Sequence, residues 1–230
     1  MSASSENYHL DPEKISLEQF RQSLQARELI PSRVILKETL AERFEVLSSM
    51  GISNLKELID SLKSKAKIEN FSKQTGLPVG YLTILKREVG SYFPNPVPLN
   101  KFPGIEAQVL LKLEKLGLKN SKQLFNSAKT NKGRQSLCSD TVISEQQLME
   151  LVQLSDLVRL YGVGPVFARL LYDVDIKSVE SFLTYGPKEI VRIYEEKTGK
   201  KADFAEKDIQ FSYEMARELD IIFRVQDLSE

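Results

Sequence analysis

The chain of 230 residues is poor in the side chains that most often carry chemistry. It contains one cysteine, Cys138, and one histidine, His9. An intramolecular disulfide is therefore impossible. Proteins of the reducing cytoplasm typically lack disulfides, so the composition fits that compartment. A zinc site of cysteines and histidines is excluded, because these two residues cannot supply four ligands. A catalytic triad or Cys–His pair would have to use His9, which lies in a polar N-terminal stretch. We therefore expect neither an enzyme nor a bound metal or cofactor.

Long apolar runs and an excess of one charge are also missing. No segment approaches the roughly 20 apolar residues of a membrane span, and the start, MSASSENYHL, has no basic region followed by an apolar one. We expect a cytoplasmic protein that makes no contact with a membrane. The 32 basic and 32 acidic residues balance, so the chain as a whole has no electrostatic signature of a nucleic-acid-binding protein.

The charge is nevertheless uneven along the chain. Residues 101–135 hold only two acidic residues, Glu106 and Glu114, and from Asp173 onwards the balance is acidic. The eight basic residues of this stretch are Lys101, Lys112, Lys115, Lys119, Lys122, Lys129, Lys132 and Arg134. A basic stretch of this kind is either a solvated surface or a place where phosphates bind.

What the sequence does contain is an internal repeat, which constrains architecture more strongly than a single motif. The string FPGIEAQVLLKLEKLGLKNSKQL aligns without a gap with LYGVGPVFARLLYDVDIKSVESF, so that Gly104 corresponds to Gly162, 58 residues later. A more distant copy, GISNLKELIDSLKSK, starts at Gly51 and matches GLKNSKQLFNSAKTN, which starts at Gly117, 66 residues later. We therefore expect three related units.

The periodicity is helical throughout, and no region alternates with period two. The pattern predicts an all-α fold of tandem helix-hairpin-helix, SAM-domain-like repeats. Prolines at 94, 96 and 98 favour an extended connector between two domains. The expected divisions are a flexible N-terminus over 1–12, an N-terminal helical domain over 13–90, the proline-rich connector over 91–98, and a C-terminal domain with two hairpin units over 99–230.

Local signals refine this outline. The position in the first unit that corresponds to Gly104 is Glu38, inside an expected long helix, so the first unit should lack a glycine hairpin. Gly51 is expected to end that helix as a left-handed cap. Asp175 stands where the other units have glycine, and aspartate tolerates the same geometry. Two later helices should start with capping boxes, at Ser144 with Gln147 and at Asp203 with Glu206.

The hairpin of the third unit is the strongest candidate for chemistry. Gly162 permits positive φ, Val163 can place its side chain in the core, and Gly164 allows a ligand to approach the backbone. A helix is expected to begin at Pro165, and its first N–H groups would favour an anion. The alternative is that the two glycines serve only a tight corner between helices.

Basic side chains flank both hairpins. Arg159 and Arg169 lie on either side of the third-unit turn and could add charge-assisted contacts to a phosphate. The second-unit turn around Gly104 is a degraded copy, because Glu106 replaces its second glycine and would repel a phosphate. The positive charges of Lys101 and Lys112, in contrast, would attract a phosphate to this turn.

One long run carries a family resemblance. TNKGRQSLCSDTVISEQQLMELVQLSDLVRLYGVGPVFARLLYDVDIKSVESF resembles domain-of-unknown-function family 4332. The matching positions are Gly133-Arg134, Thr141-Val142, Gln147-Leu148, Asp156-Leu157, Gly162-Val163-Gly164 and Ala168-Arg169-Leu170-Leu171. Val142 departs from the usual glycine. The resemblance implies an all-helical, helix-hairpin-helix-like fold and no established activity. Related helix-hairpin-helix folds bind DNA non-specifically through hairpin amides, so the resemblance also allows that function.

Two functions follow as hypotheses. The first is a non-enzymatic protein that binds the DNA or RNA backbone without strong sequence preference. The residues expected to make the contacts are Gly162, Val163, Gly164, Arg159, Arg169, Lys101, Gly104 and Lys112. The second is a protein–protein interaction module or scaffold without nucleic acid, which zero net charge, the missing first hairpin and Glu106 favour.

Overall fold

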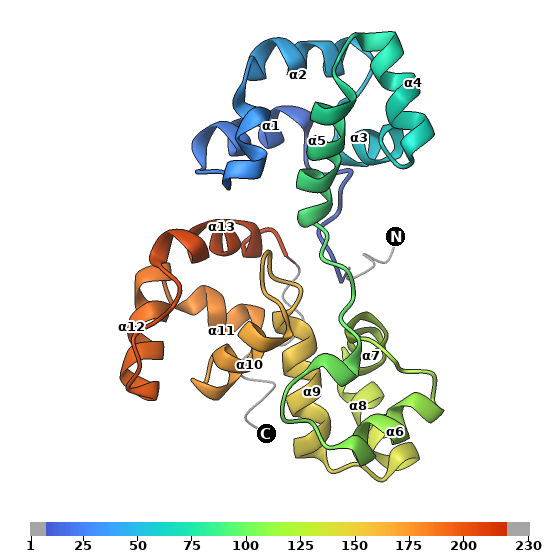
Figure 1. The fold of residues 1–230 in the computed structure, drawn as a ribbon. Helices are drawn as coiled ribbons and strands as arrows, with labels where there is room; N and C mark the ends of the chain where they lie inside the picture. The colour runs from blue at the N-terminus through green and yellow to red at the C-terminus, as the bar shows by residue number, and fades with distance from the viewer. Residues whose placement is uncertain (1–7, 220–230) are drawn as a thin grey trace. The chain divides into compact units, whose positions relative to one another are not determined.

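The structure, a computed structural model, describes residues 8–219. Within this range the chain forms helices and no β-strand, so the all-α prediction is confirmed (Figure 1). The α-helices are α1 (Leu17–Ala26), α2 (Leu40–Ser49), α3 (Leu55–Ser61), α4 (Lys65–Thr75), α5 (Val79–Ser91), α6 (Ala107–Lys115), α7 (Ser121–Ala128), α8 (Asn131–Thr141), α9 (Glu145–Leu157), α10 (Pro165–Asp173), α11 (Val179–Thr184), α12 (Pro187–Thr198) and α13 (Glu206–Ala216). Two short 3₁₀ helices are η1 (Pro31–Lys37) and η2 (Leu99–Lys101).

The chain divides into two compact bodies. Within the described residues, one is Asp11–Phe93, and the other joins residues 8–10 to residues 94–219. The second boundary falls inside the predicted connector 91–98. The first differs from the prediction of a flexible segment 1–12, because Tyr8 and Leu10 are buried in the C-terminal body. Residues 1–7 of that segment lie outside the described residues.

The backbone of the described residues follows the repeat in the sequence. Positive φ angles occur at three positions in each unit, and these positions correspond to within one residue. They are Thr39, Gly51 and Gly76 in the first, Gly104, Gly117 and Val142 in the second, and Gly162, Asp175 and Gly199 in the third. The left-handed geometry expected at Gly51 and Asp175 is therefore confirmed. Each unit then consists of four helices, α2–α5, α6–α9 and α10–α13.

The first unit corrects one expectation. The long helix predicted through Glu38 is interrupted, because η1 ends at Lys37 and Thr39 takes a left-handed φ of 43° before α2 begins. The turn brings both Leu36 and Leu40 into the core. Burial of these two side chains thus outweighs the helical pattern. A chain reversal exists here, but it uses threonine in place of glycine.

The two predicted capping boxes have different outcomes. Ser144 and Gln147 form the box at the start of α9, as predicted. The box at Asp203 is wrong, since α13 begins at Glu206, and the N–H of Ala205 donates to Asp208 Oδ2 at 2.8 Å. Phe204, which precedes the helix, does not join it, and its ring packs against the rings of Phe167 and Tyr194.

Each body is built around one long helix. In the C-terminal body α9 packs against α7, α8 and α10, and every residue from Leu151 to Leu160 is buried. In the Asp11–Phe93 body α5 packs against α3, α4 and η1 through Tyr81, Leu82, Leu85 and Val89. The candidate hairpins at Gly104 and Gly162 therefore lie next to the core helix α9 and the helices packed against it.

Candidate nucleic-acid interface

The third-unit turn has the backbone that the sequence predicts. Gly162 has a φ of 73°, Val163 is only 5% exposed, and α10 begins at Pro165 after its N-cap Gly164. No side chain accepts a hydrogen bond from the first turn of α10, and a Cβ on Gly164 would meet no atom within 4 Å. The N–H groups at this end of the helix dipole are therefore approachable and favour an anion.

The other side of the same turn is covered by α13. Ser212 Oγ donates a hydrogen bond to the Tyr161 carbonyl at 2.5 Å, and the Phe211 ring meets Tyr161 edge-on with 4.5 Å between centroids. A Cβ on Gly162 would lie 3.8 Å from Ser212 Oγ. Gly162 thus serves a packed corner, whereas Gly164 remains open.

Arg159 lies inside the protein and not at the surface. It is 2% exposed, forms an ion pair with Asp156, and donates from Nε to the Tyr8 carbonyl at 2.9 Å. Its guanidinium also stacks over Phe125 at 4.4 Å. Burial raises the pKa of Asp156, and the positive charge of Arg159 opposes that shift. The predicted contact of Arg159 with a phosphate is wrong, because burial has taken this charge out of solvent.

Arg169 connects the two hairpins. Its Nε donates to the Pro103 carbonyl at 3.0 Å, and a Cβ on Gly104 would lie 3.6 Å from its Nη2. The guanidinium is also paired with Glu150 at 2.5 Å and Asp173 at 3.4 Å. Two carboxylates therefore neutralise Arg169, and its main role is to hold the second-unit turn against α10.

The second-unit turn is more exposed. Gly104 has a φ of 79°, and both it and Lys101 are exposed. Glu106 is the N-cap of α6 but its side chain does not cap the helix; Glu106 Oε2 instead accepts a hydrogen bond from Gln147 Nε2 at 3.3 Å. The carboxylate still places negative charge beside the start of α6.

The basic stretch splits into engaged and exposed side chains. Lys112 is half-buried and donates to the Val142 carbonyl at 2.8 Å, and Arg134 is buried and donates to the Ala128 carbonyl at 3.1 Å. The lysines that remain exposed are Lys101, Lys115, Lys119, Lys122 and Lys132. Of these, Lys119 lies 3.7 Å from Glu114. The available positive charge of this unit is thus carried by lysines on η2, α6, α7, α8 and the α6–α7 turn.

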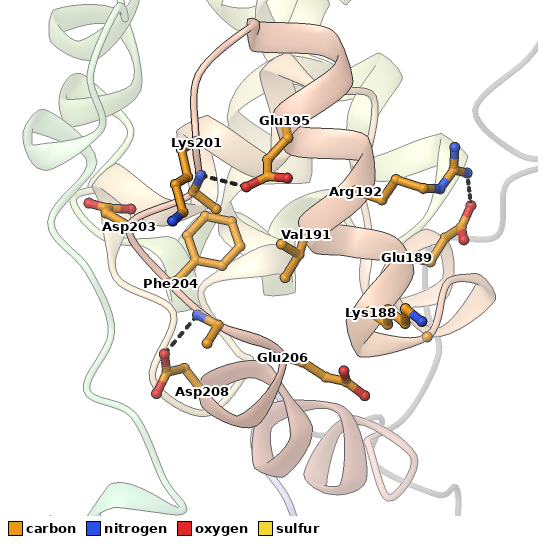
Figure 2. A pocket seen from close by; sticks show the side chains of 13 residues that line it. Lys188, Glu189, Val191, Arg192, Glu195, Lys201, Asp203, Phe204, Glu206 and Asp208 are labelled. Carbon is orange, nitrogen blue, oxygen red and sulfur yellow. Dashed lines mark hydrogen bonds and ion pairs between the residues drawn. The ribbon is translucent and has the colours of Figure 1, made fainter.

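A groove of about 1080 Å³ lies between α12 and α13 in the third unit (Figure 2). Its lining includes Phe204, Val191 and charged residues at the starts of both helices. Figure 2 shows the Phe204 ring close to Val191. The Ala202 N–H donates to Glu195 Oε1 at 3.1 Å and fixes the loop.

Sequence reasoning did not find this groove, although a signal exists. Seven residues, 199–205, separate α12 from α13, whereas three residues separate the corresponding helices of each earlier unit. The longer connection carries Phe204, whose ring packs edge-on against Phe167 at 4.9 Å and Tyr194 at 5.1 Å. An insertion relative to the repeat was therefore readable, but the hollow that it creates depends on packing.

Other candidate chemistry is sparse over residues 8–219. That range contains no group of three or more His, Cys, Asp or Glu residues that could hold a metal ion, and none of its helices is long and apolar enough to cross a membrane. Cys138 is half-buried, and burial together with the charge of Glu145 raises the pKa of its thiol. A raised pKa keeps the thiol protonated and poorly nucleophilic.

These features define an all-α protein of repeated four-helix units. Comparison with known families adds one finding: residues 103–213 match the family described as "Domain of unknown function (DUF4332)". The match begins at the second-unit hairpin and ends within α13, so it covers the second and third units. Neither the curated proteins nor the solved structures that were compared gave a match.

Proposed function

We propose that the protein is a non-enzymatic binding protein that holds the backbone of a nucleic acid without strong sequence preference. One observation carries the proposal: five exposed lysines, Lys101, Lys115, Lys119, Lys122 and Lys132, belong to one four-helix unit and the 3₁₀ turn that precedes it. Lysines at a surface neutralise phosphates and release condensed counterions, which favours binding independently of base sequence.

The backbone of the two hairpins gives secondary support to this proposal. The start of α10 offers N–H groups that no side chain caps, beside Gly164 and the exposed Val166. Together with the turn at Gly104 they resemble the helix-hairpin-helix device, in which backbone amides hold a phosphate. The positive charge would come from the lysines, since Arg159 and Arg169 are paired with carboxylates.

The test compares two charge-reversal variants by fluorescence anisotropy with labelled single- and double-stranded DNA and RNA. The first changes Lys101, Lys115 and Lys132 to glutamate. The matched control makes the same changes at Lys188, Lys200 and Lys201, which are exposed in the third unit. We expect the first variant to lose at least about tenfold in affinity and the control about threefold or less, because non-specific affinity follows the phosphates that are contacted. Equal losses would contradict a second-unit interface.

A second candidate function is a protein-interaction module. The groove between α12 and α13 favours it, because an aromatic side chain lies within a concave surface lined by both charges. A protein partner that survives nuclease treatment and is lost with Phe204→Ala, but not with the lysine variant, would support this function over the first.

The compartment follows from composition. With a single cysteine, Cys138, the chain is suited to a reducing environment. We propose a cytoplasmic location, which a fluorescent fusion and cell fractionation would test.

A further inference from the structure

The segment Tyr8–Leu10 lies on the C-terminal body, although the next residue, Asp11, begins the other body. It contains no helix. Tyr8 is 3% exposed and Leu10 6% exposed. An irregular segment of three residues rarely buries two large side chains unless a surface is shaped to receive them.

Tyr8 makes three kinds of contact with that surface. Its hydroxyl lies 2.6 Å from Ser121 Oγ, and its backbone carbonyl accepts the Arg159 Nε–H at 2.9 Å. Its ring meets Phe125 edge-on, with 5.3 Å between centroids. Hydroxyl, backbone and ring are each recognised by a different side chain.

The repeat shows that Ser121 is a special residue. It is fully buried, whereas the corresponding residues of the first and third units are the buried apolar Leu55 and Val179. A buried hydroxyl is costly without partners. Ser121 has two, because its Oγ accepts the Val97 N–H at 2.9 Å and also meets the Tyr8 hydroxyl.

The other two residues that contact Tyr8, Arg159 and Phe125, also differ from their counterparts in the repeat. Arg159 is buried, while the residue 58 positions earlier, Lys101, is exposed. Phe125 is fully buried, whereas its counterparts Ile59 and Leu183 are smaller and half-buried. Three independent departures therefore meet at one place, directly beneath Tyr8.

We propose that Ser121, Phe125 and Arg159 form a recognition site for an extended segment that bears a tyrosine. Its occupant is the chain's own segment Tyr8–Leu10. The docked segment ends at Leu10, and the next peptide bond leads into the Asp11–Phe93 body. Ser121, Phe125 and Arg159 are not among the lysines of the nucleic-acid proposal, and the inference does not depend on that proposal.

The test uses a labelled peptide of residues 4–12 and the full-length chain. In the double variant Tyr8→Ala/Leu10→Ala, the chain's own segment has lost both buried side chains and should leave the site open. We expect the peptide to bind this variant at least about tenfold more tightly than it binds the wild-type chain, where it must displace a tethered competitor. Circular dichroism confirms that the variant is folded.

A peptide with phenylalanine in place of tyrosine isolates the hydroxyl contact. It should bind the double variant about three- to tenfold more weakly, as expected for one hydrogen bond. Adding Ser121→Ala to the chain should remove the difference between the two peptides. The proposal is overturned if the folded double variant does not bind the peptide, or if the preference for tyrosine persists without Ser121.

A milder pair of variants covers the case in which the double variant does not fold. Tyr8→Phe and Ser121→Ala, alone and together, define a double-mutant cycle for the stability of the full-length chain. We expect the combined destabilisation to be clearly smaller than the sum of the two single effects. Additive effects would contradict the proposed contact.

Discussion

Asp156 Oδ2 accepts a hydrogen bond from the backbone N–H of Val179 at 2.7 Å. In the first two units the corresponding N–H groups, of Leu55 and Ser121, donate to backbone carbonyls at 3.0 and 2.8 Å. In the third unit a side-chain carboxylate thus accepts the hydrogen bond that a backbone carbonyl accepts in the other two units. Its charge is balanced by Arg159, so the residue expected to bind phosphate instead stabilises the fold.

This relationship predicts a large effect of Asp156→Ala. The change removes the acceptor of Val179 and leaves Arg159 as an uncompensated buried charge, which costs about 3–5 kcal/mol. The control is Asp173→Ala, whose carboxylate pairs with Arg169 at the surface and should matter by about 1 kcal/mol or less. Native-state hydrogen exchange of α9 and α11 measures both. Similar losses for the two variants would contradict the assigned role of Asp156.

Val142→Gly should stabilise the protein. Val142 is β-branched and has a φ of 53°, a geometry that is strained for such a residue. At 80% exposure it contributes little burial, and the equivalent residues of the other units are Gly76 and Gly199. Relief of strain, partly offset by the entropy of glycine, gives an expected gain of about 1 kcal/mol.

The reciprocal change is the control for Val142. Gly76→Val places a β-branched residue at a φ of 74° and should cost about 1–2 kcal/mol. Urea denaturation of both variants provides the comparison. A Val142→Gly protein that is less stable than the wild type would show that the valine has a packing role that its exposure does not reveal.

His9 should make stability depend on pH. Burial, with the nearby charges of Lys122 and Arg159, lowers its pKa from 6.5 to about 4. The unfolded chain therefore binds a proton more readily than the folded one between these pH values, and stability from His9 is lost as the pH falls from about 6.5 towards 4. His9→Gln should flatten this part of the profile. Thermal melts of both proteins from pH 7.5 to 4.5 measure the difference, and parallel profiles would contradict the prediction.

Glu88 should be essential to the Asp11–Phe93 body. It is fully buried and pairs with both Arg27 and Arg33, which attaches η1 and the end of α1 to α5. Glu88→Gln leaves two arginines without their counter-charge and should cost about 3–5 kcal/mol. Hydrogen exchange should show the loss in α1 and α5, whereas the C-terminal body keeps its protection. Glu69→Gln, at an exposed pair with Lys65, serves as the control.

Much of the fold was predictable because it depends on local geometry. The all-α class follows from the periodicity, and the turns at Gly162 and Asp175 follow from the few residues that tolerate positive φ. The break at Thr39 was not predictable, since threonine gives no such signal and the turn is imposed by burial of Leu36 and Leu40.

The candidate site was less predictable, because charge in a sequence does not reveal burial. Arg159 and Lys101 occupy equivalent repeat positions and look alike in sequence, yet one is buried against Asp156 and the other is exposed. The cover over Gly162 comes from Ser212, 50 residues away, and only the tertiary structure brings it there.

The most direct test of the proposed function is the salt dependence of double-stranded DNA binding by the wild-type chain. Contacts with three to five phosphates by the exposed lysines predict that log K falls linearly with log salt concentration, with a slope of about −3 to −4.5. Charge reversal of Lys101, Lys115 and Lys132 should make that slope shallower by about 2 to 3. Absence of binding at low salt, or an affinity that barely changes between low and physiological salt, would contradict the account and favour a protein partner.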